Sequence, residues 1–337
     1  MKIAVLSSIA WRTPPRKYGP WEQVASNIAE GMVEQGIDVT LFATGDSITN
    51  GKLASVCDKG YAEDMSIDPK VAECLHISNL MEQADTFDLI HNNFDFLPLS
   101  YSRLIKTPMV TTIHGFSSSK IIPVYKKYDS TSYYVSISNS DRSPELNYTA
   151  TIYNGINSND FTFNCDPEDY LLFFGRIHPD KGVCESIEIA KKSKRKLIIS
   201  GIIQDQEYFD KSVKPYVNDN DIVYVGNSGP DTRNKLLGGA CALLHPINFD
   251  EPFGLSVVEA MFCGTPVIAF NRGSMPELIL DRKTGFLARN MDEAVEAVHY
   301  ISLIKRKDCR EWATSKFSRE KMIEGYLEVY QKILRIQ

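Results

Sequence analysis

Short apolar runs alternate with amphipathic segments along the whole chain. The runs in the first half are residues 2–8, 37–44, 87–93, 108–114 and 132–138. Those in the second half are residues 169–176, 196–201, 221–226, 241–246 and 265–270. Runs that are apolar throughout and end in polar residues are typical of parallel strands buried on both faces. The pattern therefore predicts an α/β protein with two Rossmann-like, doubly wound domains.

Helical spacing is clearest at the two ends of the chain. Apolar side chains recur at Trp21, Val24, Ala25, Ile28 and Met32, and Gly36 follows where a helix commonly ends. Near the C-terminus a second amphipathic segment runs from Met322 to Ile333, after a break at residues 316–318. Between the two series of strands, residues 153–169 are rich in Asn, Asp and Gly, which is typical of a linker.

Composition excludes several classes of protein. A length of 337 residues suits two domains, and 43% hydrophobic with 24% charged residues is ordinary for a globular protein. The seven cysteines form no C-x-x-C pair, so neither a disulfide framework nor a zinc site is indicated. The N-terminus is interpreted as a strand and not as a signal peptide, and no apolar run approaches a membrane span of about 20 residues. We expect a cytoplasmic protein without an integral membrane span.

The charge balance argues against nucleic acid as a partner. Residues 1–165 contain 13 Lys and Arg against 18 Asp and Glu, a net charge of −5, and the remaining 24 and 25 give −1. Neither half has the basic surplus expected of a nucleic-acid binder. The first βα loop, TPPRKYGP, contains no G-x-G-x-x-G, and a Walker A motif is absent from the sequence. Hydride transfer and P-loop phosphoryl transfer thus lose their best evidence.

Two stretches suggest another way of binding phosphates. In FFGRIHPDKG (173–182), Arg176 and Lys181 lie five positions apart after a strand, which suits a diphosphate. A solvated basic loop is the favoured interpretation of such a pair seen alone. In EPFGLSVVEAM (251–261), the backbone of Gly254, Leu255 and Ser256 opens a predicted helix, where anions bind.

The two glutamates of that second stretch cannot share one helix face. Pro252 favours an extended conformation for Glu251 on the approach loop, whereas Glu259 lies in the helix. A sugar at one glutamate, a ribose at the other and phosphates between them would fit this arrangement.

These segments together resemble the retaining glycosyltransferases of family 4. The resemblance covers nearly the whole chain: PPRKYGPWE, NGIN, FGRIHPDKG, LIISG, EPFGLSVVEAMFCGTPVIAFNRGSMPELI and TGFL. It implies the GT-B fold, with an acceptor-binding domain at 1–160 that the C-terminal residues 317–337 rejoin. It also implies a donor-binding domain at 167–316, and a central cleft between the two domains.

The resemblance further implies transfer of a hexose from a UDP- or GDP-linked donor to a saccharide or glycoconjugate acceptor. The anomeric configuration would be retained by a front-face mechanism that needs no metal or other cofactor. Arg176 and Lys181 would neutralise the diphosphate, Glu251 would hold sugar hydroxyls and Glu259 the ribose. The sequence DND (219–221) precedes a strand, so we interpret it as a turn and not as a metal site.

Other residues are placed by the same comparison. His114 ends a strand and is either a structural group or a contact of the donor sugar. Further donor contacts are expected from Gly19, Gly201, Gln204, Asp205 and Phe253. Acceptor contacts are expected from Tyr18, Glu22, Asn92, Asn93 and Asp95, although for the last three a capping role at the end of the strand is the favoured interpretation.

The first loop departs from the family pattern, because Pro20 replaces the second glycine of a Gly-Gly pair and removes one N–H donor. SMPEL (274–278) predicts a capping box between Ser274 and Glu277. Two alternatives remain: a nucleotide-sugar epimerase, and a non-catalytic sugar-nucleotide-binding protein on the same fold.

Overall fold

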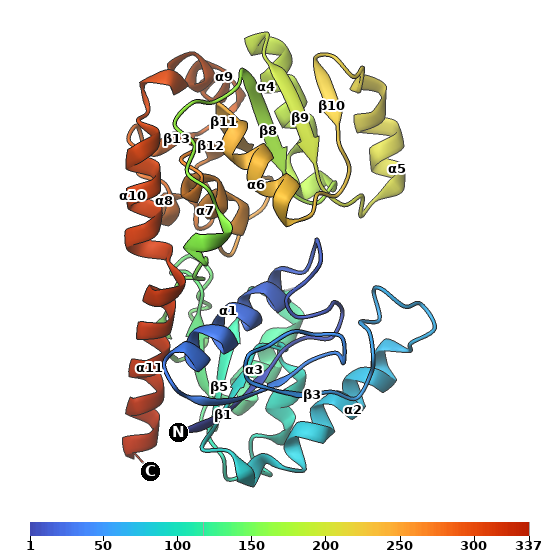
Figure 1. Ribbon diagram of the computed structural model, residues 1–337, viewed down its shortest axis with the longest axis vertical. Helices are drawn as coiled ribbons and strands as arrows, with labels where there is room; N and C mark the ends of the chain where they lie inside the picture. Colours follow the sequence, from blue (N-terminus) through green and yellow to red (C-terminus); the bar gives the residue numbers. More distant parts are fainter. Residues whose placement is uncertain (117, 337) are drawn as a thin grey trace. The chain divides into compact units, whose positions relative to one another are not determined.

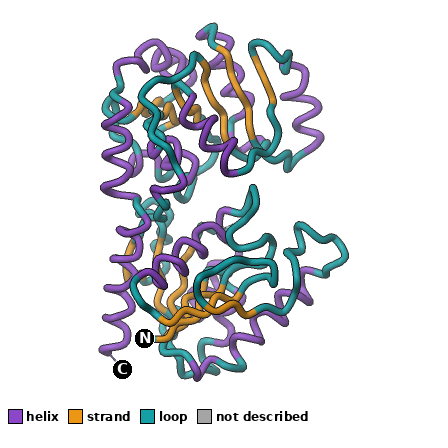
Figure 2. The backbone as a smooth tube through the Cα atoms, in the orientation of Figure 1, coloured by secondary structure: helices purple, strands orange, loops and turns teal. Residues whose placement is uncertain are grey.

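The chain folds into two compact units. The computed structural model describes residues 1–116 and 118–336 (Figure 1). Unit 1 contains Met1–Gly155 and Arg319–Gln337, and unit 2 contains Ile156–Ser318. Each unit is built on a parallel sheet with helices packed beside it (Figure 2).

Unit 1 contains a seven-stranded parallel sheet in the order β3-β2-β1-β4-β5-β6-β7. Its strands are β1 (Lys2–Leu6), β2 (Asp38–Phe42), β3 (Lys52–Ala54), β4 (Leu89–Asn92), β5 (Met109–Ile113), β6 (Tyr133–Ser136) and β7 (Tyr148–Thr151). Its α-helices are α1 (Pro20–Glu34), α2 (Pro69–Met81), α3 (Ile122–Tyr128) and α11 (Arg319–Ile336).

Unit 2 contains a six-stranded parallel sheet in the order β10-β9-β8-β11-β12-β13. Its strands are β8 (Tyr170–Phe174), β9 (Lys196–Ser200), β10 (Ile222–Tyr224), β11 (Ala242–His245), β12 (Val267–Phe270) and β13 (Gly285–Ala288). Its α-helices are α4 (Val183–Ser193), α5 (Gln206–Tyr208), α6 (Pro230–Gly239), α7 (Leu255–Phe262), α8 (Met275–Leu278), α9 (Met291–Tyr300) and α10 (Arg306–Phe317).

The predicted fold class is confirmed: every apolar run named above contains a strand, and several strands, such as β4, include the polar residues at their carboxyl ends. The sequence pattern missed the edge strands β3 and β7, which are short and partly exposed. Strand β13 was missed as well, because its four residues begin with a glycine. Strands at an edge bury less apolar surface, so their sequences carry a weaker signal.

Helix α11 returns to unit 1 and lies along α1 (Figure 1). The two helices approach so closely at Gly31 that a Cβ there would lie 2.5 Å from Cγ1 of Ile323. Arg319, at the start of α11, donates two hydrogen bonds to the carboxylate of Glu34, at 2.6 and 2.7 Å. Only a glycine permits this spacing, so helix packing and the ion pair fix α11 at one position on α1.

A buried polar network also joins α11 to the sheet of unit 1. Nδ1 of His91 lies 2.5 Å from the hydroxyl of Tyr330, and Nε2 lies 2.7 Å from the hydroxyl of Thr112. That threonine hydroxyl is in turn 2.7 Å from the hydroxyl of Tyr326. Burial lowers the pKa of His91 to about 3, so the ring is neutral and each ring nitrogen has a hydrogen-bond partner.

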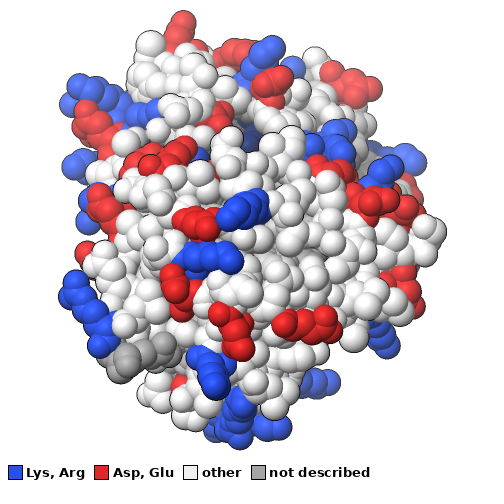
Figure 3. Space-filling view, turned by 60° about the horizontal axis from the view of Figure 1, so that its bottom comes forward, with Lys and Arg blue, Asp and Glu red and all other residues white. Residues whose placement is uncertain are grey.

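Charged side chains of both signs are interspersed on the face shown in Figure 3. Within the described residues, no helix is both long enough and apolar enough to cross a membrane.

We expect Tyr330→Phe to lower the free energy of unfolding by about 1–3 kcal/mol, because Nδ1 of buried His91 loses its partner. The shift of the urea midpoint measures this loss. Tyr300→Phe is the control, since Tyr300 is 49% exposed and should change the midpoint little. Equal midpoints for the two variants would contradict a stabilising role of the network.

Candidate functional site

The loop after β8 positions two cations of unit 2. A single helical turn, Pro179–Lys181, follows the strand, and Gly182 then begins α4 with a φ of 75°. A Cβ at Gly182 would lie 1.9 Å from the carbonyl oxygen of Pro246, so no other residue fits there. This close approach brings the β8 loop against the loop that follows β11.

Lys181 reaches Glu251 across these two loops. Its Nζ lies 2.5 Å from Oε2 of Glu251, and the side chains are only 14% and 13% exposed. Nζ also lies 4.6 Å from the ring centroid of Phe249. Charged groups that are this deeply buried must be paired, because each alone would lose its hydration without compensation. The structure therefore joins the predicted phosphate-binding lysine to the predicted sugar-binding acid.

His245, the last residue of β11, lies beneath this ion pair. Its Nε2 is 3.7 Å from Oε2 of Glu251 and has no hydrogen-bond partner within residues 1–116 and 118–336. Burial lowers the pKa of His245 to about 4; Glu251 opposes this shift and Lys181 adds to it. The ring is therefore neutral at pH 7 and adds no charge to the pair.

Arg176 lies on the same loop as Lys181 but contacts a different partner. Its guanidinium donates a hydrogen bond to the side-chain oxygen of Gln204, in the loop after β9. The two loops touch at Gly201, where a Cβ would lie 1.6 Å from the carbonyl oxygen of Gly175. Asp205 caps α5 by accepting a hydrogen bond from N–H of Tyr208 at 2.9 Å. Two predicted donor contacts, Arg176 and Gln204, are thus brought together, and Asp205 has a structural role.

Helix α7 begins where the sequence predicts an anion site. Gly254 precedes it with a φ of 100°, and N–H of Val257 turns back to the carbonyl of Gly254 at 3.1 Å. The first N–H groups of the helix belong to Leu255 and Ser256, which are both partly exposed. The side chain of Phe253 is buried against Phe317, so any contact of Phe253 with a ligand would come from its backbone.

The loop before α7 is held by residues 273 and 274. A Cβ at Gly273 would lie 2.4 Å from the nitrogen of Glu251, and N–H of Ser274 donates to the carbonyl of Glu251 at 3.0 Å. The hydroxyl of Ser274 donates to the carbonyl of Phe253 at 2.5 Å and makes no cap of α8. The predicted capping box is therefore wrong, because this hydroxyl holds the Glu251 loop in place.

Glu259 lies inside α7, away from Glu251, and is paired with Arg233 of α6. Nη1 of Arg233 lies 3.1 Å from Oε1 of Glu259, and its guanidinium lies 5.0 Å from the ring centroid of Phe161. Burial raises the pKa of Glu259 and Arg233 opposes the shift. The sequence analysis missed Arg233, because an arginine on an amphipathic helix resembles any surface arginine until the fold places it.

In unit 1, His114 follows β5 and is partly exposed. Its Nε2 lies 3.0 Å from the side-chain oxygen of Asn93, and its ring stacks on Trp21 at 5.8 Å. Desolvation lowers the pKa of His114, so the ring is neutral. The amide nitrogen of Asn93 is buried and has no hydrogen-bond partner in the described part of the chain. These two side chains form the polar end of the sheet of unit 1.

The other predicted acceptor residues mainly hold the backbone. Asn92 donates to the carbonyl of Asp95 at 2.8 Å and accepts from N–H of Phe94 at 2.9 Å, which is the capping role. Asp95 accepts from the hydroxyl of Tyr125 at 2.5 Å, and burial raises the pKa of Asp95 to about 6.

The first loop is held by Glu22 in a similar way. Glu22 is buried and accepts from the hydroxyl of Ser8 at 2.7 Å and from N–H of Trp11 at 3.2 Å. A Cβ at Gly19 would lie 2.8 Å from Cβ of Pro15, so the loop is tightly packed. Tyr18 is partly exposed and meets the ring of Trp11 edge to face at 6.1 Å. Glu22 therefore holds the conformation of this loop, which also contains Tyr18.

Comparison with known proteins finds similarity to glycosyltransferases. Residues 158–324 match the family model "Glycosyl transferases group 1". An uncharacterised glycosyltransferase of Methanocaldococcus jannaschii is 25% identical over 332 residues, which covers 85% of this chain and 84% of that protein. Trehalose synthase of Pyrococcus horikoshii is 31% identical over 190 residues, 51% of this chain and 46% of that protein.

Solved structures match over nearly the whole length. Sucrose-phosphate synthase of Thermosynechococcus elongatus has a TM-score of 0.81 at 18% identity, covering 100% of both chains. AviGT4, a glycosyltransferase involved in avilamycin A biosynthesis, has a TM-score of 0.72 at 22% identity, covering 99% of this chain and 98% of that one. The fold is GT-B, and the chain belongs to the group 1 glycosyltransferases of family 4.

We expect Arg233→Ala to lower the free energy of unfolding by about 3 kcal/mol at pH 8, because Glu259 is left as an uncompensated buried charge. The loss should be smaller at pH 5. Glu259 has a raised pKa in the folded state, so its contribution to stability is greatest at low pH and is lost as the pH rises through that value. Removal of Arg233 should raise the pKa of Glu259 further, so the stability of the variant should fall more steeply with rising pH than that of the wild type.

Urea unfolding of wild type and variant at the two pH values measures the difference. Arg272→Ala is the control, since its contact with Asp250 is 3.7 Å long and exposed. A loss for Arg233→Ala that is equal at pH 5 and pH 8 would show that the guanidinium does not stabilise the glutamate charge.

Proposed function

We propose that the chain is a retaining hexosyltransferase that uses a nucleotide diphosphate sugar, UDP- or GDP-linked, as donor. The acceptor would be a hydroxyl of a saccharide or glycoconjugate. The observation that carries the proposal is the meeting of Lys181 and Glu251 beside the start of α7. A cation, a carboxylate and free helix N–H groups within one loop cluster provide what a sugar diphosphate requires.

Unit 2 would bind the donor, because these groups all belong to it. Its loops follow the carboxyl ends of β8, β9 and β11, where ligands of open parallel sheets bind. HepE of Anabaena, solved with UDP-glucose, has a TM-score of 0.74 to this chain at 18% identity, which makes a uridine nucleotide a natural first choice of donor to test. Unit 1, with His114 after β5 and Asn93 after β4, would bind the acceptor.

Each group of the site has its own role in the proposed transfer. Lys181 and Arg176 would take the negative charge that develops on the departing diphosphate, together with the N–H groups at the start of α7. The bond between the anomeric carbon and the phosphate oxygen breaks as the acceptor oxygen attacks the same face. The acceptor proton passes to the leaving phosphate. Glu251 would hold hydroxyls of the sugar, and neutral His114 can donate or accept a hydrogen bond but carries no charge.

Glu259 has a different part in this scheme. It is buried with Arg233, so a ribose hydroxyl would have to reach an oxygen that the arginine leaves available. Such a bond is the same in the ground state and in the transition state. It therefore contributes to donor affinity and little to the rate of the chemical step.

We expect Glu251→Gln to lower kcat by a factor on the order of 10², as for the loss of one preorganised electrostatic group. Glu259→Gln should mainly raise the KM for the donor. Release of nucleoside diphosphate from a panel of nucleotide sugars, with analysis of the product, gives both constants. Glu251→Gln with an unchanged kcat would remove Glu251 from the reaction, and an epimerised donor as sole product would favour the epimerase alternative.

Turnover should not depend on a divalent cation, because Lys181 and Arg176 supply positive charge at the place of the diphosphate. Activity is expected to be the same in EDTA as in magnesium or manganese. Lys181→Ala should lower kcat/KM far more than Lys120→Ala, an exposed lysine of unit 1. Loss of activity in EDTA that magnesium restores would overturn the metal-independent mechanism.

A further inference from the structure

Unit 1 contains a second candidate binding site, on the opposite edge of its sheet from His114. A cavity of about 420 Å³ lies where β5, β6 and β7 begin, since Thr107, Ser132 and Asn147 stand just before those strands. Helix α11 closes one side with Lys332 and Ile333. Exposed residues form part of its wall, so a ligand can enter from solvent.

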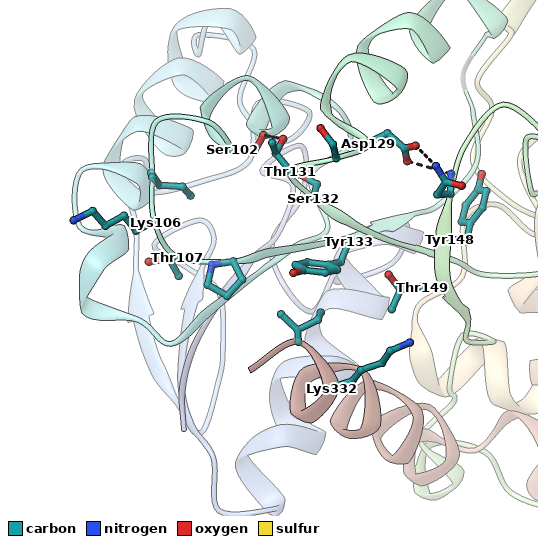
Figure 4. A pocket seen from close by; sticks show the side chains of 15 residues that line it. Ser102, Lys106, Thr107, Asp129, Thr131, Ser132, Tyr133, Tyr148, Thr149 and Lys332 are labelled. Atoms are coloured by element: carbon teal, nitrogen blue, oxygen red, sulfur yellow. Dashed lines mark hydrogen bonds between the residues drawn. The ribbon is translucent and has the colours of Figure 1, made fainter. Parts of the chain in front are cut away.

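The cavity is lined mainly by hydroxyl and charged groups, several of which have no partner (Figure 4). Ser132 is only 6% exposed, and its buried hydroxyl has no hydrogen-bond partner in the described residues. The side chains of Lys106, Tyr133 and Lys332 have no hydrogen-bond or ion-pair partner within the same described residues. A buried hydroxyl without a partner is costly, so a ligand or water must supply one.

The carboxylate in the cavity wall is already hydrogen-bonded, so the charged groups left for a ligand are positive. Asp129 accepts from the backbone N–H and the amide of Asn147, at 3.1 and 2.5 Å. The hydroxyls of Ser102 and Thr131 lie 2.9 Å apart and satisfy each other. The only carboxylate of the lining is thus occupied, whereas both lysines remain available.

The arrangement separates the two lysines. In Figure 4, Tyr133 lies in the centre of the cavity, with Lys106 and Lys332 on opposite sides of it. Hydroxyl groups, which both donate and accept, suit the hydroxyls of a sugar, and the ring of Tyr133 offers a flat apolar surface to a sugar face. An ammonium group suits a carboxylate or a phosphate.

We propose that this cavity binds an anionic saccharide, a sugar that carries a carboxylate or a phosphate. A volume of about 420 Å³ is within the range of small-molecule sites. Loops at the amino ends of the strands take no part in the reaction site, which lies at the carboxyl ends. The occupant is therefore a bound ligand and not the hydroxyl acceptor of the transfer. This proposal does not rest on the proposed function.

The test is isothermal titration calorimetry of the full chain with four probes: glucuronate, glucose 6-phosphate, glucose and inorganic phosphate. Both anionic sugars should bind at least about tenfold more tightly than glucose, which lacks the charge-assisted hydrogen bond. They should also bind at least about tenfold more tightly than phosphate, which lacks the hydroxyls.

Variants locate the binding. Lys332→Ala should weaken binding of both anionic sugars at least about tenfold, whereas Arg335→Ala, an equal loss of charge at another exposed position of α11, should not. Ser132→Ala should weaken binding while leaving the Tm unchanged or raised, because the hydroxyl it removes has no partner. Lys181→Ala should retain the affinity, which separates this site from the candidate donor site of unit 2.

Several results would overturn the proposal. These are no heat with any probe, equal affinity for glucose and glucuronate, or binding of phosphate alone as tight as that of glucose 6-phosphate. Equal effects of Lys332→Ala and Arg335→Ala would also overturn it. Loss of sugar binding in Lys181→Ala would assign the binding to unit 2 instead.

Discussion

Parallel hydrogen bonding between strands is the constraint on which both units depend. Adjacent parallel strands require a crossover, and each crossover brings the chain back to the same edge of the sheet. The carboxyl ends of β8, β9 and β11 therefore meet, and the loops that follow them are forced together. Gly182 and Gly201 show how close this approach is, since a Cβ at either would overlap a backbone carbonyl. The candidate donor site is a direct result of this crowding.

Buried ion pairs then set the positions of the acids within that site. Glu251 is held by Lys181 and Glu259 by Arg233, and neither carboxylate is freely solvated. In the proposed function, an incoming diphosphate would compete with Glu251 for Lys181, so donor binding would be linked to the release of Glu251 toward the sugar. Glu259 lacks such an exchange, because its arginine comes from α6 and lies away from the loop cluster. This difference separates a group that can respond to the donor from one that fixes the helix.

Unit 1 uses its polar residues in another way. Many polar side chains at the carboxyl ends of its strands bond to backbone or to each other, as Asn92, Asp95 and Glu22 do. His114, hydrogen-bonded to the buried Asn93, is partly exposed. At the amino ends, the hydroxyl of Ser132 has no hydrogen-bond partner among the described residues, and it lines the same cavity as Lys106 and Lys332. One sheet thus carries a polar group with an unmet hydrogen bond at each edge.

The sequence by itself determined most of the strands, their parallel arrangement and the two loops that carry the candidate site residues. Apolar runs, glycines and prolines act locally, and their signal survives without the rest of the fold. The sequence also predicted Lys181 and Glu251 as site residues, but not as partners of each other, because they are 70 positions apart. Arg233, the burial of Glu22, the role of Ser274 and the cavity beside α11 were decided by tertiary structure alone. Each depends on which distant segment packs against it, and burial and pairing are properties of the assembled chain, not of any one stretch of residues.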